Sequence, residues 1–149
     1  MFFWNKNEYK RINKGPFNIK KVEAMQDAII VITSWGKEKN NDVLTKNIVV
    51  RPNGEIYSFK QKIGKEEYQE YKLNKVGRNA VELLIDFAKE IIDNQIFEST
   101  KIFDYGDSVK INTEDYNFEM KNPYRTDNGK RVSLYKLLED KIKEFIEKY

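Results

Sequence analysis

The sequence contains no cysteine and no histidine among its 149 residues. Without cysteine, the chain can form no disulfide, carries no thiol nucleophile and offers no thiolate to a metal ion. Without histidine, it has no imidazole base, so a Ser-His-Asp triad and a histidine-bound zinc site are both excluded. These two absences remove several common routes to catalysis before any motif is considered.

Glycine and proline are scarce, at 7 and 3 residues, and no linker or internal repeat divides the chain. A chain of this length is therefore expected to form one domain around a single core. The longest uninterrupted apolar run, residues 28–32, is far shorter than the roughly 20 residues of a membrane span. The apolar residues 1–4 lead straight into polar ones, so we predict no signal peptide and expect a cytosolic protein that does not bind a membrane.

Charged side chains make up 34% of the chain, with 27 basic and 24 acidic residues and a net charge of +3. Basic residues gather in positions 1–21, where only Glu8 opposes them: Lys6, Lys10, Arg11, Lys14, Lys20 and Lys21. Aromatic residues are interleaved with them: Phe2, Phe3, Trp4, Tyr9 and Phe17. Rings that stack on bases beside lysines that follow phosphates are typical of nucleic-acid binding. The alternative is an edge strand packed on the core with its lysines in water.

Several segments carry strand signals. Residues 17–22 alternate loosely between apolar and polar, and residues 28–33 form a continuous β-branched run, as in a strand covered on both faces. Residues 48–59 predict a β-hairpin, because Arg51-Pro52-Asn53-Gly54 offers turn residues between two strand-forming flanks. Residues 65–73 fit either a helix or a third strand.

Two later segments predict helices. Asn79 and Glu82 resemble a capping box before a wide apolar stripe, which predicts a helix over about 79–96 that is the most buried element. Ser133 begins a second amphipathic helix over 133–149. Between them, residues 101–103, 108–111 and 116–120 predict short strands, with a turn at 112–115. The expected fold is a single α+β domain over 1–149, with a largely antiparallel sheet of five to seven strands and both helices packed on it.

One motif points to catalysis. Asp104 precedes Glu119-x-Lys121, and this pattern resembles the D…(D/E)xK motif of restriction-endonuclease-like nucleases. The resemblance implies that the two carboxylates hold a divalent metal and that the lysine stabilises charge at the attacked phosphate. Asp107 is the alternative first carboxylate. The other interpretation is that these are solvated charges on a strand face, because the Glu-x-Lys tripeptide also occurs elsewhere in this lysine-rich and glutamate-rich chain.

A second pattern points to protein binding. The stretch 104–119 contains five carboxylates and only one basic residue, Lys110, together with two tyrosines that could anchor a partner. The predicted partner-binding residues are Asp104, Tyr105, Asp107, Glu114, Asp115, Tyr116 and Glu119. The alternative is an ordinary polar hairpin. A calcium loop is not predicted, because the aspartate spacing does not match the one such a loop requires.

These patterns favour a non-catalytic intracellular protein that blocks a macromolecular partner with a basic surface, and they call for no cofactor and no metal. A small α+β chain without cysteine or histidine and with polarised charge is typical of bacterial toxin-immunity proteins and phage-encoded inhibitors of host defence. The alternatives are a metal-dependent nuclease that uses Asp104, Glu119 and Lys121, and a nucleic-acid-binding protein that uses the basic segment 6–21.

Overall fold

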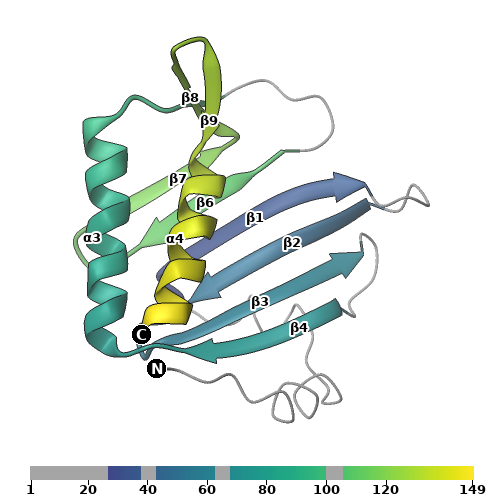
Figure 1. Cartoon of the computed structure of the whole chain (residues 1–149), viewed down its shortest axis with the longest axis vertical. Helices are drawn as coiled ribbons and strands as arrows, with labels where there is room; N and C mark the ends of the chain where they lie inside the picture. Colours follow the sequence, from purple (N-terminus) through teal and green to yellow (C-terminus); the bar gives the residue numbers. More distant parts are fainter. Residues whose placement is uncertain (1–26, 38–42, 63–67, 100–105) are drawn as a thin grey trace.

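The computed structural model describes residues 27–37, 43–62, 68–99 and 106–149. Six antiparallel strands form the main sheet, in the order β4-β3-β2-β1-β6-β7 (Figure 1). Their bounds are Ile30–Lys37 (β1), Val43–Val50 (β2), Glu55–Lys62 (β3), Tyr68–Lys75 (β4), Ser108–Asn112 (β6) and Asn117–Lys121 (β7). A smaller sheet has the order β5-β8-β9, with bounds Glu98–Ser99 (β5), Pro123–Asp127 (β8) and Lys130–Ser133 (β9).

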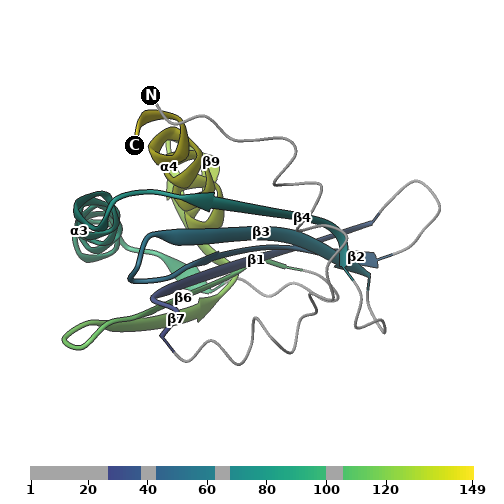
Figure 2. The same ribbon diagram turned by 90° about the horizontal axis from the view of Figure 1, so that it is seen from below.

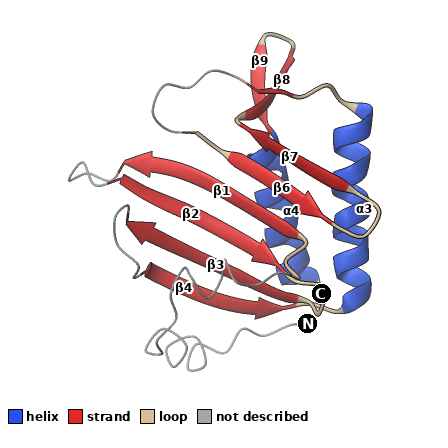
Figure 3. Cartoon of the chain, turned by 180° about the vertical axis from the view of Figure 1, so that it is seen from behind, coloured by secondary structure: helices blue, strands red, loops and turns tan. Residues whose placement is uncertain are grey.

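Two helices, α3 (Arg78–Asn94) and α4 (Leu134–Lys148), cover one face of the main sheet. Figure 2 shows both on the same side of the strands, and Figure 3, from behind, shows the strands in front of them. The predicted α+β fold with a largely antiparallel sheet is therefore confirmed. None of the helices in the described residues is long and apolar enough to cross a membrane.

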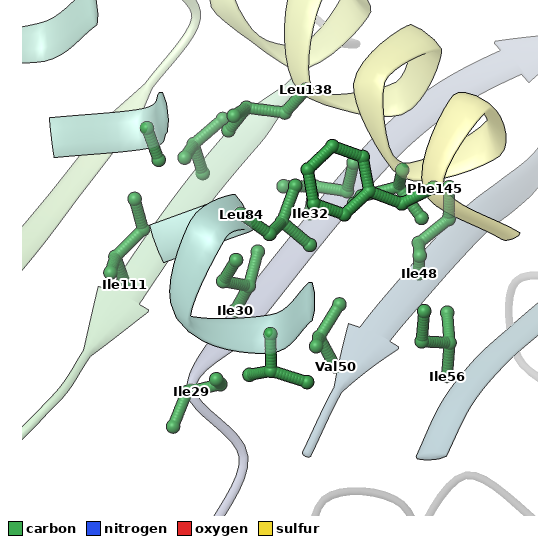
Figure 4. Close-up of a cluster of buried hydrophobic side chains, with 14 of the residues drawn as sticks. Ile29, Ile30, Ile32, Ile48, Val50, Ile56, Leu84, Ile111, Leu138 and Phe145 are labelled. Carbon is green, nitrogen blue, oxygen red and sulfur yellow. The ribbon is translucent and has the colours of Figure 1, made fainter. Parts of the chain in front are cut away.

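The strand register explains where the core lies. Ile30 and Ile32 of β1 are fully buried, and they stand opposite Val50 and Ile48 of β2 on the helix side of the sheet. Because alternate residues of a strand point to opposite faces, the same rows continue into the neighbouring strands. Three leucines, one isoleucine and one phenylalanine of the two helices belong to the same core cluster: Leu84, Leu134, Leu138, Ile142 and Phe145. Figure 4 shows Leu84, Leu138 and Phe145 beside these rows.

The predicted hairpin at 48–59 is present as β2 and β3. The Gly54 amide donates to the Arg51 carbonyl at 3.0 Å, and Gly54 has a φ of 96°. A Cβ atom on Gly54 would stand 1.9 Å from the Val76 carbonyl oxygen. This turn therefore needs glycine for its backbone conformation and for the close approach of the chain that follows β4.

The structure settles three details of the sequence prediction. Residues 65–73 were ambiguous, and the described part of this segment belongs to the strand β4. The predicted capping box at Asn79 is wrong, because α3 begins after Gly77 and no side chain caps it. Ser133 does cap α4, accepting a hydrogen bond from the Lys136 amide at 3.2 Å.

The prediction that the helix at 79–96 is the most buried element is also wrong. The described helices differ in their buried residues: α3 buries Ala80, Val81, Leu84 and Ala88, whereas α4 buries Leu134, Tyr135, Leu138, Glu139, Ile142 and Phe145. Figure 1 shows the reason, since α4 lies across the middle of the sheet while α3 runs along one end of the strands, from the end of β4 past β7. The width of an apolar stripe does not say where on a sheet its helix packs.

The β8–β9 hairpin was not predicted. Its turn contains Asn128 and Gly129 with φ values of 51° and 78°, which is the conformation that favours Asn-Gly in two-residue hairpins. The predicted strands at 17–22 and 101–103 lie outside the described residues, as does the basic segment 6–21.

Two neighbouring leucines of α3 provide a test of the packing. Leu84 is fully buried, whereas the Leu83 residue is 48% exposed. We expect Leu84→Ala to lower the free energy of unfolding by about 2–5 kcal/mol, through lost burial and a cavity. Leu83→Ala should change it by less than about 0.5 kcal/mol. Urea unfolding of both variants measures this difference, and equal effects would contradict the assigned register of α3.

Candidate functional site

Asp107 precedes β6 and is engaged inside the protein. Its carboxylate accepts hydrogen bonds from the Tyr124 hydroxyl at 3.2 Å and from the Ser133 hydroxyl at 3.1 Å. Its backbone amide donates to the side-chain oxygen of Asn122 at 2.7 Å. Asp107 therefore links β6 to the β8–β9 hairpin and to the start of α4. Both hydroxyls donate to the same carboxylate oxygen, Oδ2, of this half-buried side chain, so Asp107, which the sequence predicts to bind a partner, has a structural role within the fold.

Tyr116 connects the β6–β7 turn to α3. Its hydroxyl donates to the Asp93 carboxylate at 3.4 Å, and the Lys89 ammonium lies 5.3 Å from the centre of its ring. Burial and the neighbouring Asp93 raise the pKa of the Tyr116 hydroxyl. Figures 1 and 3 both show this turn beside α3. The exposed Glu114 and Asp115, which precede Tyr116, are thereby held next to the helix.

Helix α3 presents a row of carboxylates to solvent. Glu82, Asp86 and Glu90 follow one another at intervals of four residues, and Asp93 lies three residues after Glu90. At 3.6 residues per turn, these four positions share one side of the helix, opposite the buried Leu84 and its neighbours. All four are exposed.

The helix row and the hairpin turn together form one surface, which we call the acidic face. It consists of Glu82, Asp86, Glu90, Asp93, Glu114 and Asp115. Within the described residues, none of the six forms an ion pair with a lysine or arginine, whereas six other carboxylates do: Asp27, Glu55, Asp127, Glu139, Asp140 and Glu144. Four other described carboxylates, Glu98, Asp107, Glu119 and Glu147, also lack an ion pair, so the acidic face holds six of the ten.

Only part of this surface is predicted from the sequence. Glu114, Asp115 and Tyr116 were predicted to bind a partner, and the structure places them together beside α3. The predicted residues Asp104 and Tyr105 lie outside the described residues. The four carboxylates of α3 were missed, although their spacing already placed them on one side of a predicted helix. What the sequence did not contain was the proximity of that helix to the turn.

Glu119 and Lys121 are separate from the acidic face. Both are exposed residues of β7, and the alternation of the strand directs them away from the helices. Glu119 stands opposite Lys110 of β6. The distance from Glu119 to Asp104, on which the nuclease hypothesis depends, involves a residue outside the described part, so that hypothesis stays a prediction. Among the described residues, no three carboxylates are grouped so that they could hold a metal ion.

Glu139 is the most deeply buried carboxylate among the described residues, with its side chain 4% exposed. It lies 2.9 Å from the Lys46 ammonium of β2, and it accepts a hydrogen bond from the Tyr135 hydroxyl at 2.8 Å. Burial alone raises the pKa of Glu139, but the hydrogen bonds from Lys46 and Tyr135 outweigh burial and hold this pKa at about 2. A carboxylate that is ionised so firmly is suited to joining α4 to the sheet, not to proton transfer.

Comparison with protein-family models, curated proteins and solved structures found no significant match to this chain. The acidic face and the contacts that assemble it are therefore the features of the chain that bear on its function.

The low pKa of Glu139 predicts a pH dependence of stability. Because the folded-state pKa lies below the ordinary value of 4.5, the ionised carboxylate stabilises the fold above that value. This contribution is lost as the pH falls toward 2. Glu139→Gln should therefore lower the free energy of unfolding at neutral pH, and the difference from wild type should disappear near pH 2.

Urea unfolding of both proteins across this pH range measures the effect. The exposed Glu147, on the same helix, provides the control, since Glu147→Gln should differ little from wild type at any pH. A difference for Glu139→Gln that is constant from pH 2 to about pH 7 would contradict the prediction.

Proposed function

We propose that this chain is a non-catalytic binding protein that uses the acidic face to cover a basic surface on a macromolecular partner. The observation that carries the proposal is the gathering of six exposed carboxylates from two distant segments, without an ion pair among the described residues. Carboxylates that are crowded in this way repel one another. A partner with lysines and arginines relieves this repulsion when it binds.

The shape of the face also suits a protein partner. α3 is a regular helix of 17 residues, packed on the sheet through its apolar side. The Tyr116 contacts hold the adjoining turn, so the carboxylates are presented by structured elements and little conformational entropy is lost on binding. Leu83, at 48% exposure, lies on α3 beside Glu82 and offers an apolar contact next to the charges.

Covering a basic surface is a means of inhibition. Protein surfaces rich in lysine and arginine are the ones that bind phosphates and nucleic acids. An acidic face that occupies such a surface competes with the anionic ligand. We therefore assign the chain to the class of toxin-immunity proteins or phage inhibitors of host defence, acting in the cytoplasm.

Charge reversal on the acidic face tests this function. We expect Asp86→Lys or Glu90→Lys to reduce the association rate with the natural partner several-fold at low salt, because electrostatic attraction speeds the encounter. The effect should shrink as salt screens the charges. The measurement is the rate of association and dissociation at two ionic strengths, with the partner captured from the source cell.

The matched control is Glu147→Lys, which changes the net charge equally at an exposed glutamate of α4. It should leave both rates close to those of wild type. If Asp86→Lys and Glu90→Lys behave as this control does, the acidic face is not the interface and the proposed function fails.

A further inference from the structure

β7 forms one edge of the main sheet, and β4 forms the other. β7 pairs with β6 over its whole length. In the described part of the chain, no strand pairs with its other side. An edge of this kind presents backbone donors and acceptors that a strand from another chain can bind.

Three contacts establish which backbone groups of β7 point outward. The Asn112 amide of β6 donates to Ile29 at 2.8 Å, so Asn112 is directed toward β1 and away from β7. The Asn122 amide donates to Asp107 at 2.6 Å, on the β6 side. On the opposite side, the Ser99 hydroxyl donates to the Lys121 carbonyl. Since bonding direction alternates along an antiparallel strand, the amides and carbonyls of Asn117 and Glu119 face outward.

The side chains of β7 are also divided between two environments. Phe118 and Met120 are half-buried and pack against the core under the helices. Asn117 and Glu119 point to the other face of the sheet and are exposed. A strand added to this edge would continue the same alternation. Its residue opposite Glu119 would lie beside a carboxylate, and its residues opposite Phe118 and Met120 would lie beside apolar groups.

We propose that the edge of β7 binds an extended segment of the partner in which lysine or arginine alternates with apolar residues. The inference rests on the proposed function, because the acidic face adjoins this edge through Tyr116, the residue that precedes β7. The negative charge of the acidic face favours a basic segment of the partner over a second copy of this chain. A second copy of the chain would bring two acidic faces toward each other, whereas a basic segment is attracted by the acidic face; Glu119 itself has Lys110 and Lys121 as neighbours on its side of the sheet.

Proline substitution at an outward-facing amide gives a sharp test. Glu119→Pro removes an outward amide but none of the hydrogen bonds between β7 and β6. Glu119→Gln removes the charge and keeps the amide. The probe is a fluorescent peptide of about eight residues, alternating lysine and valine, which matches the length of a common strand. Fluorescence anisotropy gives its dissociation constant, and a glutamate-valine peptide is the negative control.

We expect the lysine-valine peptide to bind wild type, and Glu119→Pro to weaken binding about tenfold more than Glu119→Gln does, while the unfolding transition stays close to that of wild type. Equal affinities of the two variants would overturn the proposal. It would also be overturned if the peptide did not bind wild type at millimolar concentration or if the glutamate-valine peptide bound equally well.

A second measurement decides the matter if Glu119→Pro does not fold. Hydrogen exchange of the wild-type Asn117 and Glu119 amides should slow when the peptide is added, since both amides would then be hydrogen-bonded. Unchanged exchange at both would overturn the proposal.

The variants of the acidic face separate this inference from the proposed function. If Asp86→Lys slows association with the natural partner but Glu119→Pro affects neither that partner nor the peptide, the acidic face is the interface and strand addition is wrong. If Glu119→Pro weakens binding of the peptide but Asp86→Lys leaves association with the natural partner unchanged, the edge binds basic strands and the proposed function fails.

Discussion

The structure depends on the packing of both helices against the two central isoleucines of β1. Ile30 and Ile32 have no exposed surface, and β1 pairs with β2 on one side and with β6 on the other. β1 therefore joins the strands that precede α3 to those that follow it. The amphipathic helices have an apolar surface to cover only when this sheet has formed, because isolated helices of this length are marginally stable in water.

The carboxylates of the protein have two different uses. Asp107 and Glu139 are hydrogen-bonded between elements, Asp107 to Tyr124 and Ser133, and Glu139 to Lys46 and Tyr135. Glu139 is buried and must be paired in this way, because an unpaired carboxylate would be costly to remove from water, whereas Asp107 is only half-buried. The carboxylates of the acidic face remain in solvent, where repulsion between them is partly screened. Their crowding is therefore compatible with a stable fold and available for binding.

Helix α3 serves both purposes at once. Its apolar side, with Leu84 and Ala88, contributes to the core, and its opposite side contributes four carboxylates to the acidic face. The Tyr116 contacts join this helix to the turn that begins β7. The acidic face and the edge of β7 are thereby neighbours, although β7 follows α3 by more than twenty residues in the chain.

The sequence by itself determined the local elements, because these depend on residues that are neighbours in the chain. Alternation and turn residues predicted the β2–β3 hairpin, and the apolar stripes predicted both helices and the Ser133 cap. The β8–β9 hairpin also has a local signal, the turn dipeptide Asn128-Gly129, but this hairpin was not predicted. The α+β class follows from such elements, since each must bury one apolar face.

Only the tertiary structure decided which elements meet. The hydrogen bonds of Asp107 with Tyr124 and Ser133, and that of Asp93 with Tyr116, join residues far apart in the chain. The deeper burial of α4 than of α3 also depends on packing between distant elements. No local pattern contains such contacts, because they depend on how helices are placed on a sheet. The acidic face is of this kind. Its carboxylates can be counted in the sequence, but they become one surface only because α3 packs beside the β6–β7 turn.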